Sequence, residues 1–97
     1  MAKGYWITIY REVLDPTRLA DYAALAGPAI EAGGGRFLVR GAPVFTFEGA
    51  NDQRTVVIEF GSVREAVATY NSPGYQAALA LLRGAVERDV RMVEGST

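Results

Sequence analysis

Two stretches, Tyr5-Trp6-Ile7-Thr8-Ile9-Tyr10 and Thr55-Val56-Val57-Ile58-Glu59-Phe60, decide the fold of this chain. Both are rich in aromatic and β-branched residues, which favour strands. Neither face of the first stretch is clearly polar, and the second is strongly apolar apart from Glu59. Strands of this kind need cover on both faces, so we expect both stretches to lie inside a sheet and not at its edge.

Two further segments, residues 36–40 and 89–94, have the character of edge strands. The first carries arginine at both ends, a common protection of a sheet edge, and the second alternates polar and apolar residues. Residues 44–48 also alternate, and we expect them to continue the earlier edge strand beyond a bulge. The chain therefore supplies four strands.

Helix signals lie between these strands. Asp15-Pro16 has the form of an N-cap followed by proline at the first helical position, and an apolar stripe at helical spacing follows it. Gly27-Pro28 is expected to kink that helix or end it early. A capping box predicts a helix over residues 62–70, and Ser72 is expected to cap a further helix after the break at Asn71.

The resulting order, β-α-β-β-α-β, is the ferredoxin-like split pattern of an α+β protein. In this topology the first and third strands lie in the centre of a four-stranded antiparallel sheet, and the two charge-flanked segments fall at its edges. The 97 residues suffice for one such domain, residues 1–97, with both helical segments on one face of the sheet.

The other face of the sheet needs a different cover. Alternation places Tyr5, Ile7 and Ile9 on one face and Trp6, Thr8 and Tyr10 on the other. We expect the purely apolar set, Tyr5, Ile7 and Ile9, to face the helices, which leaves the second set exposed beside Glu59. Such a face is too apolar for a stable monomer, so the sequence predicts a homodimer that pairs sheet face to sheet face.

The composition excludes several classes of function. Ten basic and eleven acidic residues leave a net charge of -1, which gives no general attraction to nucleic acid or to an anionic membrane. The absence of histidine and cysteine excludes Ser-His triads, thiolate metal sites and cysteine nucleophiles. Without a signal segment or an apolar span, we expect a cytoplasmic protein, and no metal or cofactor is predicted.

The ordered motifs of the chain resemble a known family. They include Lys3-Gly4-Tyr5-Trp6-Ile7, Asp15-Pro16, Gly33-Gly34, Phe37-Leu38-Val39-Arg40-Gly41, Val57-Ile58-Glu59-Phe60, Tyr70-Asn71-Ser72-Pro73, Arg83 and Val93-Glu94-Gly95. Together they resemble the small bacterial family called domain of unknown function 1330. The resemblance implies the dimeric α/β-barrel variant of the ferredoxin-like fold and brings no established activity. Other branches of that superfamily include cofactor-independent monooxygenases, isomerases, haem enzymes and ligand sensors, and fold analogy alone does not choose among them.

Glu59 and Tyr10 are the candidate catalytic residues. A carboxylate in a central apolar strand has a raised pKa unless a cation pairs with it, and such groups serve as bases or ligand anchors. The alternative for Glu59 is a buried ion pair with Arg40 or Arg36. The Tyr10 hydroxyl would orient a carbonyl or enolate oxygen, and the alternative for Tyr10 is packing in the dimer.

Arg40, Trp6, Thr8 and Arg83 are the candidate substrate-binding residues. Arg40, which precedes a glycine, would bind an anionic ligand, unless it pairs with Glu59 or is a solvated edge charge. Trp6 would line the same space, with dimer packing as its alternative, and Arg83 would contact an anion at the rim or tie down a loop.

Three functions stay open on these residues. The first is a small-molecule site of a cofactor-independent monooxygenase or isomerase type that takes a small anionic or aromatic molecule. The second is a ligand-binding module without catalysis, and the third is a structural dimer.

Overall fold

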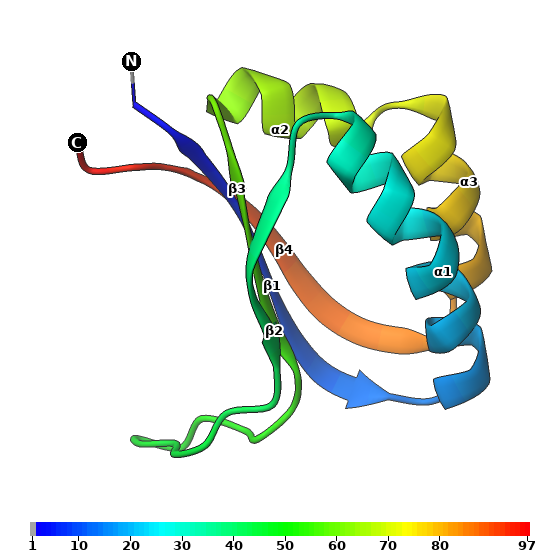
Figure 1. Ribbon diagram of the computed structural model, residues 1–97. Coiled ribbons are helices and arrows are strands. Elements are labelled where there is room, and N and C mark those ends of the chain that lie inside the picture. The colour runs from blue at the N-terminus through cyan, green and yellow to red at the C-terminus, as the bar shows by residue number, and fades with distance from the viewer. Residues whose placement is uncertain (1) are drawn as a thin grey trace.

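Residues 2–97, which the computed structural model describes, form a four-stranded antiparallel sheet with three helices on one of its faces (Figure 1). The strands are β1 (Gly4–Val13), β2 (Arg36–Gly41), β3 (Thr55–Phe60) and β4 (Val86–Glu94), and the helices are α1 (Pro16–Ala32), α2 (Val63–Tyr70) and α3 (Pro73–Leu82). The strand order is β2-β3-β1-β4. The two most apolar strands are therefore central and the charge-flanked strands form the edges, as the sequence predicts.

The inward face of β1 is the aromatic one, and the predicted assignment of its two faces was wrong. Trp6 pairs with Ile58 across β1 and β3, whereas Tyr5 pairs with Glu59. Paired residues share a face, so Trp6, Thr8 and Tyr10 point toward the helices, where all three are buried. The helices can cover the large rings of Trp6 and Tyr10, which bury far more apolar area than the isoleucines between them.

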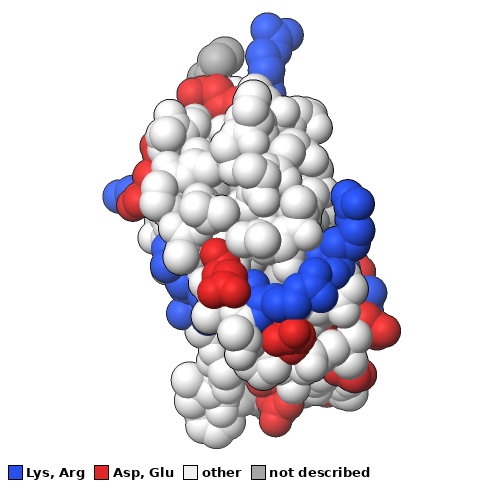
Figure 2. Space-filling model, turned by 90° about the vertical axis from the view of Figure 1, so that its right-hand side faces the viewer, with Lys and Arg blue, Asp and Glu red and all other residues white. Residues whose placement is uncertain are grey.

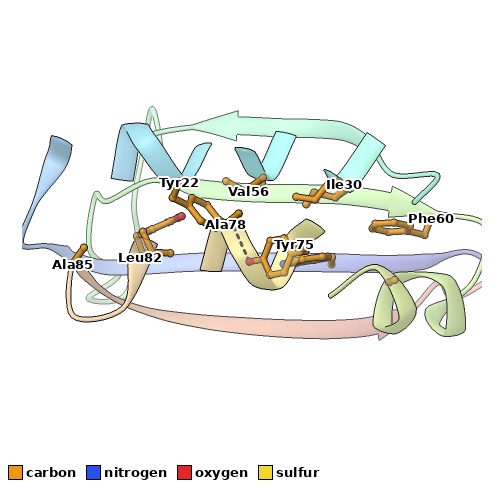
Figure 3. Close-up of a cluster of buried hydrophobic side chains, with 13 residues drawn as sticks. Tyr22, Ile30, Val56, Phe60, Tyr75, Ala78, Leu82 and Ala85 are labelled. Carbon is orange, nitrogen blue, oxygen red and sulfur yellow. Dashed lines mark hydrogen bonds between the residues drawn. The ribbon is translucent and has the colours of Figure 1, made fainter. Parts of the chain in front are cut away.

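Trp6 lies at the centre of the core with an exposed fraction of 1%. Its ring stacks at 6.2 Å on Phe60 and meets the edge of Tyr75 at 4.8 Å, measured between ring centroids. The Trp6 Nε1–H donates to the Thr8 hydroxyl over 3.1 Å, so the indole is also satisfied as a donor. Figure 3 shows that Tyr22 from α1 and Tyr75 from α3 meet over the sheet. The core therefore joins both helical segments to β1.

Side-chain caps begin all three helices, as the sequence predicts. The carboxylate of Asp15 accepts from the N–H of Arg18, and the hydroxyl of Ser62 accepts from that of Glu65. The hydroxyl of Ser72 accepts from the N–H of Tyr75, which starts a helix separate from α2. The element order is therefore β-α-β-β-α-α-β, with two short helices in the second connection.

Two local details differ from the sequence-based expectation. Pro28 does not end α1 early: the helix continues past it to Ala32, because Ile30 beyond the proline is anchored in the core. Residues 44–48 form no strand and belong to the loop 42–54 between β2 and β3. The register shift that they were expected to follow lies within β2, between Phe37 and Val39. Packing against the core explains both outcomes. Ile30 holds the end of α1 on the core, whereas residues 44–48 do not pack against it.

The face of the sheet away from the helices is uncovered in the single chain, and we call it the open face. It carries Tyr5, Ile7, Ile9, Val39, Val57, Glu59, Asp89, Arg91 and Val93. The loop 42–54 extends to the same side of the sheet (Figure 1) and exposes Val44, Phe45 and Phe47 by 77% or more. The largest exposed apolar side chains therefore lie on the side of the open face.

The helix-covered side has a different character. Figure 2 shows charged side chains across its lower half and along its margins, whereas the middle of the upper half is uncharged. The ten residues of α3 include no charged residue. No helix in the part of the chain that the structure describes is long and apolar enough to cross a membrane.

Candidate functional site

A cavity of about 250 Å³ lies between α1 and the helix-facing side of the sheet. The apolar part of its wall comes from Trp6 on β1, Leu19 and Ala26 on α1, Phe37 on β2 and Ile58 on β3. A space of this size accepts one aromatic ring with small substituents, since a dry cavity of roughly 150 Å³ already holds benzene. The cavity is therefore large enough for a small organic molecule.

The charged side chains that line this cavity all have the same sign. Arg40, Arg54 and Arg88 contribute to its wall, and no acidic residue among residues 2–97 does. The salt bridges of the described residues involve none of these three arginines. In a protein whose net charge is only -1, the cavity concentrates three positive charges that have no counterion among residues 2–97.

Sheet register explains why the arginines converge. Tyr10 pairs with Arg88 on β4, and on its other side the N–H of Tyr10 donates to the carbonyl oxygen of Arg54 over 3.0 Å. Arg54, the residue just before β3, thus lies in one row with Tyr10 of β1 and Arg88 of β4. Arg40 pairs with Val56, two residues along from Arg54, so it is on the same face of the sheet.

Arg88 is held by tyrosine hydroxyls. Its guanidinium donates to the hydroxyl of Tyr75 over 3.0 Å and to those of Tyr10 and Tyr22 over 3.4 Å each. The hydroxyls of Tyr22 and Tyr75 share a further hydrogen bond of 2.7 Å, drawn as a dashed line in Figure 3. These contacts fix the position of the guanidinium without neutralising it, because the tyrosines are uncharged.

The ionisation of Tyr10 and Tyr75 is suppressed. Burial raises the pKa of Tyr10, and burial together with the neighbouring Tyr22 raises the pKa of Tyr75 further. Burial alone would lower the pKa of Arg88, but the oxygens of Tyr22 and Tyr75 hold it above its ordinary value. Near neutral pH the cluster therefore consists of a cation and neutral hydroxyls.

Raised tyrosine pKa values predict a loss of stability in alkali. Unfolded tyrosines ionise above about pH 10, whereas Tyr10 and Tyr75 stay protonated in the fold, so unfolding becomes more favourable as pH rises. Below that pH these tyrosines do not change the free energy of unfolding. Above it, the free energy of unfolding falls by about 1.4 kcal/mol per pH unit for each of the two tyrosines. Urea titrations across this range should show the slope, and Tyr75→Phe should reduce it. A slope that this variant leaves unaltered would contradict the assignment.

Glu59 is not part of the cavity. It lies on the open face, where its carboxylate accepts from Arg36 over 3.2 Å and from the hydroxyl of Tyr5 over 3.4 Å, with Lys3 at 3.6 Å. The ion pair with Arg36 is one of the two pairings that the sequence left open. The structure thus separates Glu59 from Tyr10, its predicted catalytic partner, by the thickness of the sheet.

The other predicted residues divide between two places. Trp6, Thr8, Tyr10 and Arg40 all line the cavity, although not on the predicted face. The guanidinium of Arg40 lies 3.6 Å above the ring centroid of Phe37 and makes no pair with Glu59. Arg83 lies outside the cavity, in a neighbouring surface depression that Arg88 also lines.

Sequence reasoning missed Arg54, Arg88, Tyr22 and Tyr75 as site residues. Arg88 did carry a signal, since it is in phase with Val90 and Met92, the residues of β4 that pair with the inward residues of β1. An arginine on the buried face of a strand points to a site. Tyr22 and Tyr75 gave no such signal, because both fit the apolar stripes of their helices. The described residues contain no cluster of acidic side chains suited to a metal ion.

The arrangement of strands and helices defines the structural class of the protein. The open sheet with helices on one face is the ferredoxin-like α+β architecture. It resembles a dimeric ferredoxin-like protein of unknown function from Thermobifida fusca, with a TM-score of 0.64 at 18% identity over 96% of this chain and 91% of that one. The chain belongs to the family described as Domain of unknown function (DUF1330), which it matches over residues 3–96.

Two other solved structures have the same fold. A protein of unknown function from Rhodopseudomonas palustris has a TM-score of 0.75 at 17% identity, covering 99% of this chain and 84% of that one. SnoaB, a cofactor-independent oxygenase from Streptomyces nogalater, has a TM-score of 0.68 at 12% identity, covering 100% and 96%. No curated protein matches the chain. At these identities the likeness establishes the fold alone.

Proposed function

We propose that the protein binds a small organic anion in the cavity between α1 and the sheet. The observation that carries this proposal is the lining of an apolar, aromatic-walled cavity by three arginines and, among the described residues, by no carboxylate. Guanidinium groups with no counterion favour an anionic ligand, and the planar group of Arg88 suits a carboxylate. The aromatic wall of the cavity suits a ring.

The same geometry supports binding more strongly than proton transfer. The titratable side chains along the cavity are tyrosines and arginines, and burial keeps Tyr10 and Tyr75 protonated. None of these groups accepts a proton near neutral pH, and Glu59 lies on the other face of the sheet. Tyr10 therefore acts in this proposal as a hydrogen-bond donor beside the ligand.

Binding of benzoate, a one-ring monoanion, tests the proposal. We expect benzoate to raise the temperature of thermal unfolding and Arg88→Gln to weaken its binding by about tenfold or more, since a charge-assisted contact is lost. The matched control is Arg64→Gln, an exposed position on α2, which should bind benzoate like the parent protein. Failure of benzoate and other small aromatic acids to bind would refute the site.

Oxygenation or isomerisation of an activated substrate is the second candidate function. Arg88 and the tyrosine hydroxyls around it form a group of donors able to stabilise the oxygen of an enolate or phenolate. A ligand in that form is the electron-rich species that reacts with oxygen or shifts a double bond. The oxygenase of the same fold supports this candidate, and oxygen uptake with a bound phenol would distinguish it from binding alone.

We also propose that a second copy of the chain covers the open face. The Thermobifida fusca protein and another neighbour, from Bacteroides fragilis, are both described as dimeric with this fold. The open face carries half-buried aliphatic side chains on its central strands, and the loop 42–54 adds exposed Phe45 and Phe47 on the same side. Around the aliphatic centre are both cations and acids, including Arg36, Arg91 and Asp89, so two copies have charges to pair.

A further inference from the structure

We infer that the ligand carries two acidic groups on one small frame. This inference rests on the proposed anion site and extends it, because the three arginines of the cavity form two separate positive positions. One is Arg88 on β4, and the other is the pair Arg40 and Arg54 at the β2 and β3 side. A single carboxylate engages one of these positions and leaves the other without a counterion.

The separation of the two positions follows from the sheet. Arg88 and Arg54 lie on either side of Tyr10 in one row, and neighbouring strands are about 4.8 Å apart, so their backbones are about 10 Å apart. Arg40 is diagonal to Arg54 on the next strand. The guanidinium groups extend from both sides over the space between the two positions. They can therefore reach the two ends of a one-ring diacid.

Arg88 and Arg40, at the two ends of the cavity, differ in their surroundings. Arg88 is half-buried among three tyrosine hydroxyls, whereas Arg40 is exposed and rests on the ring of Phe37. We place one carboxylate at Arg88, inside the aromatic wall, and the other at Arg40 and Arg54, toward solvent. The ring between them lies along Trp6 and Ile58, which line the middle strands of the cavity.

The aromatic wall and the three arginines of the cavity exclude most other ligand classes of this size. Cations meet three like charges, and neutral aromatic molecules leave every guanidinium without a counterion. A diacid meets both positive positions at once, and the second contact forms within the same complex, so little extra entropy is lost. Small aromatic dicarboxylates therefore fit the cavity better than monocarboxylates of the same ring.

Calorimetric titration with isophthalate and benzoate at one pH and ionic strength tests the inference. We expect isophthalate to bind at least about tenfold more tightly than benzoate, the value of one further charge-assisted contact. Arg40→Gln and Arg54→Gln should each bring this ratio close to one, whereas Arg64→Gln should leave it as in the parent protein. Two separate variants are used because a local structural effect of one substitution would not be shared by the other.

The outcomes separate this inference from the proposed function. Benzoate binding with no gain for isophthalate would overturn the diacid inference and leave the anion site standing. A gain for isophthalate that persists in both variants would also overturn it, because the second contact would then lie elsewhere. If neither compound binds and the protein is folded, the anion site itself fails and the diacid inference falls with it.

Discussion

Replacing Trp6 with alanine is expected to lower the free energy of unfolding by about 3–5 kcal/mol, which is much of the stability of a domain this small. The indole is almost fully buried, stacks on Phe60, meets Tyr75 in a T-shaped contact and donates to the hydroxyl of Thr8. The truncation therefore leaves a large void and removes the hydrogen-bond donor that Thr8 faces. Urea or thermal unfolding followed by circular dichroism measures the change.

Two further variants control this result. Trp6→Phe keeps most of the ring and should cost clearly less than the alanine variant. Leu25→Ala, at a half-exposed position on the outer side of α1, should change stability by less than about 0.5 kcal/mol. A Trp6→Ala protein that is as stable as the parent but has lost its dimer would place the indole on the open face and contradict the structure.

Ile7→Lys is expected to dissociate the proposed dimer. Ile7 lies on the central strand β1 in the middle of the open face, beside Val57. In a two-fold dimer the substitution occurs twice, and each ammonium would be buried without a partner at several kcal/mol. We expect the dissociation constant to rise on the order of 1,000-fold or more, as measured by sedimentation velocity over a range of protein concentrations.

The same charge on the opposite side of the molecule is the matched control. Ala24→Lys changes an exposed position of α1 and should leave the assembly as it is in the parent protein. Circular dichroism should show that the Ile7→Lys protein keeps its fold, since Ile7 is not part of the core beneath the helices. A parent protein that sediments as a monomer at low micromolar concentration would refute the dimer.

Much of the fold could be predicted because its signals are local. The strand character of β1 and β3, the charges that bracket β2 and the caps at Asp15, Ser62 and Ser72 are all properties of short segments. Topology then follows, since the ferredoxin-like order places the most apolar strands in the centre. The wrong extension of β2 over residues 44–48 shows the limit of this reasoning: alternation is necessary for a strand but does not supply a neighbour to pair with.

The site was predicted only in part, because it depends on contacts between distant segments. Trp6, Thr8, Tyr10 and Arg40 could be named from their strands, but Glu59 was grouped with them on the wrong assumption about the faces of β1. Arg88 and Tyr75 come from the last part of the chain and meet Tyr10 only through the pairing of β4 with β1 and the packing of α3. No pattern within a single segment indicates that these side chains come into contact.

The sequence by itself determined the order of the elements, the central and edge strands and the helix starts. Only the tertiary structure decided which face of β1 turns inward. Both of its faces are apolar, so alternation defines two sets of residues without ranking them. The choice depends on packing across the helix-sheet interface, where Tyr75 packs against the ring of Trp6 and also meets that of Tyr22 on α1. That packing brings Arg40, Arg54 and Arg88 around one cavity and leaves Glu59 on the opposite side of the sheet.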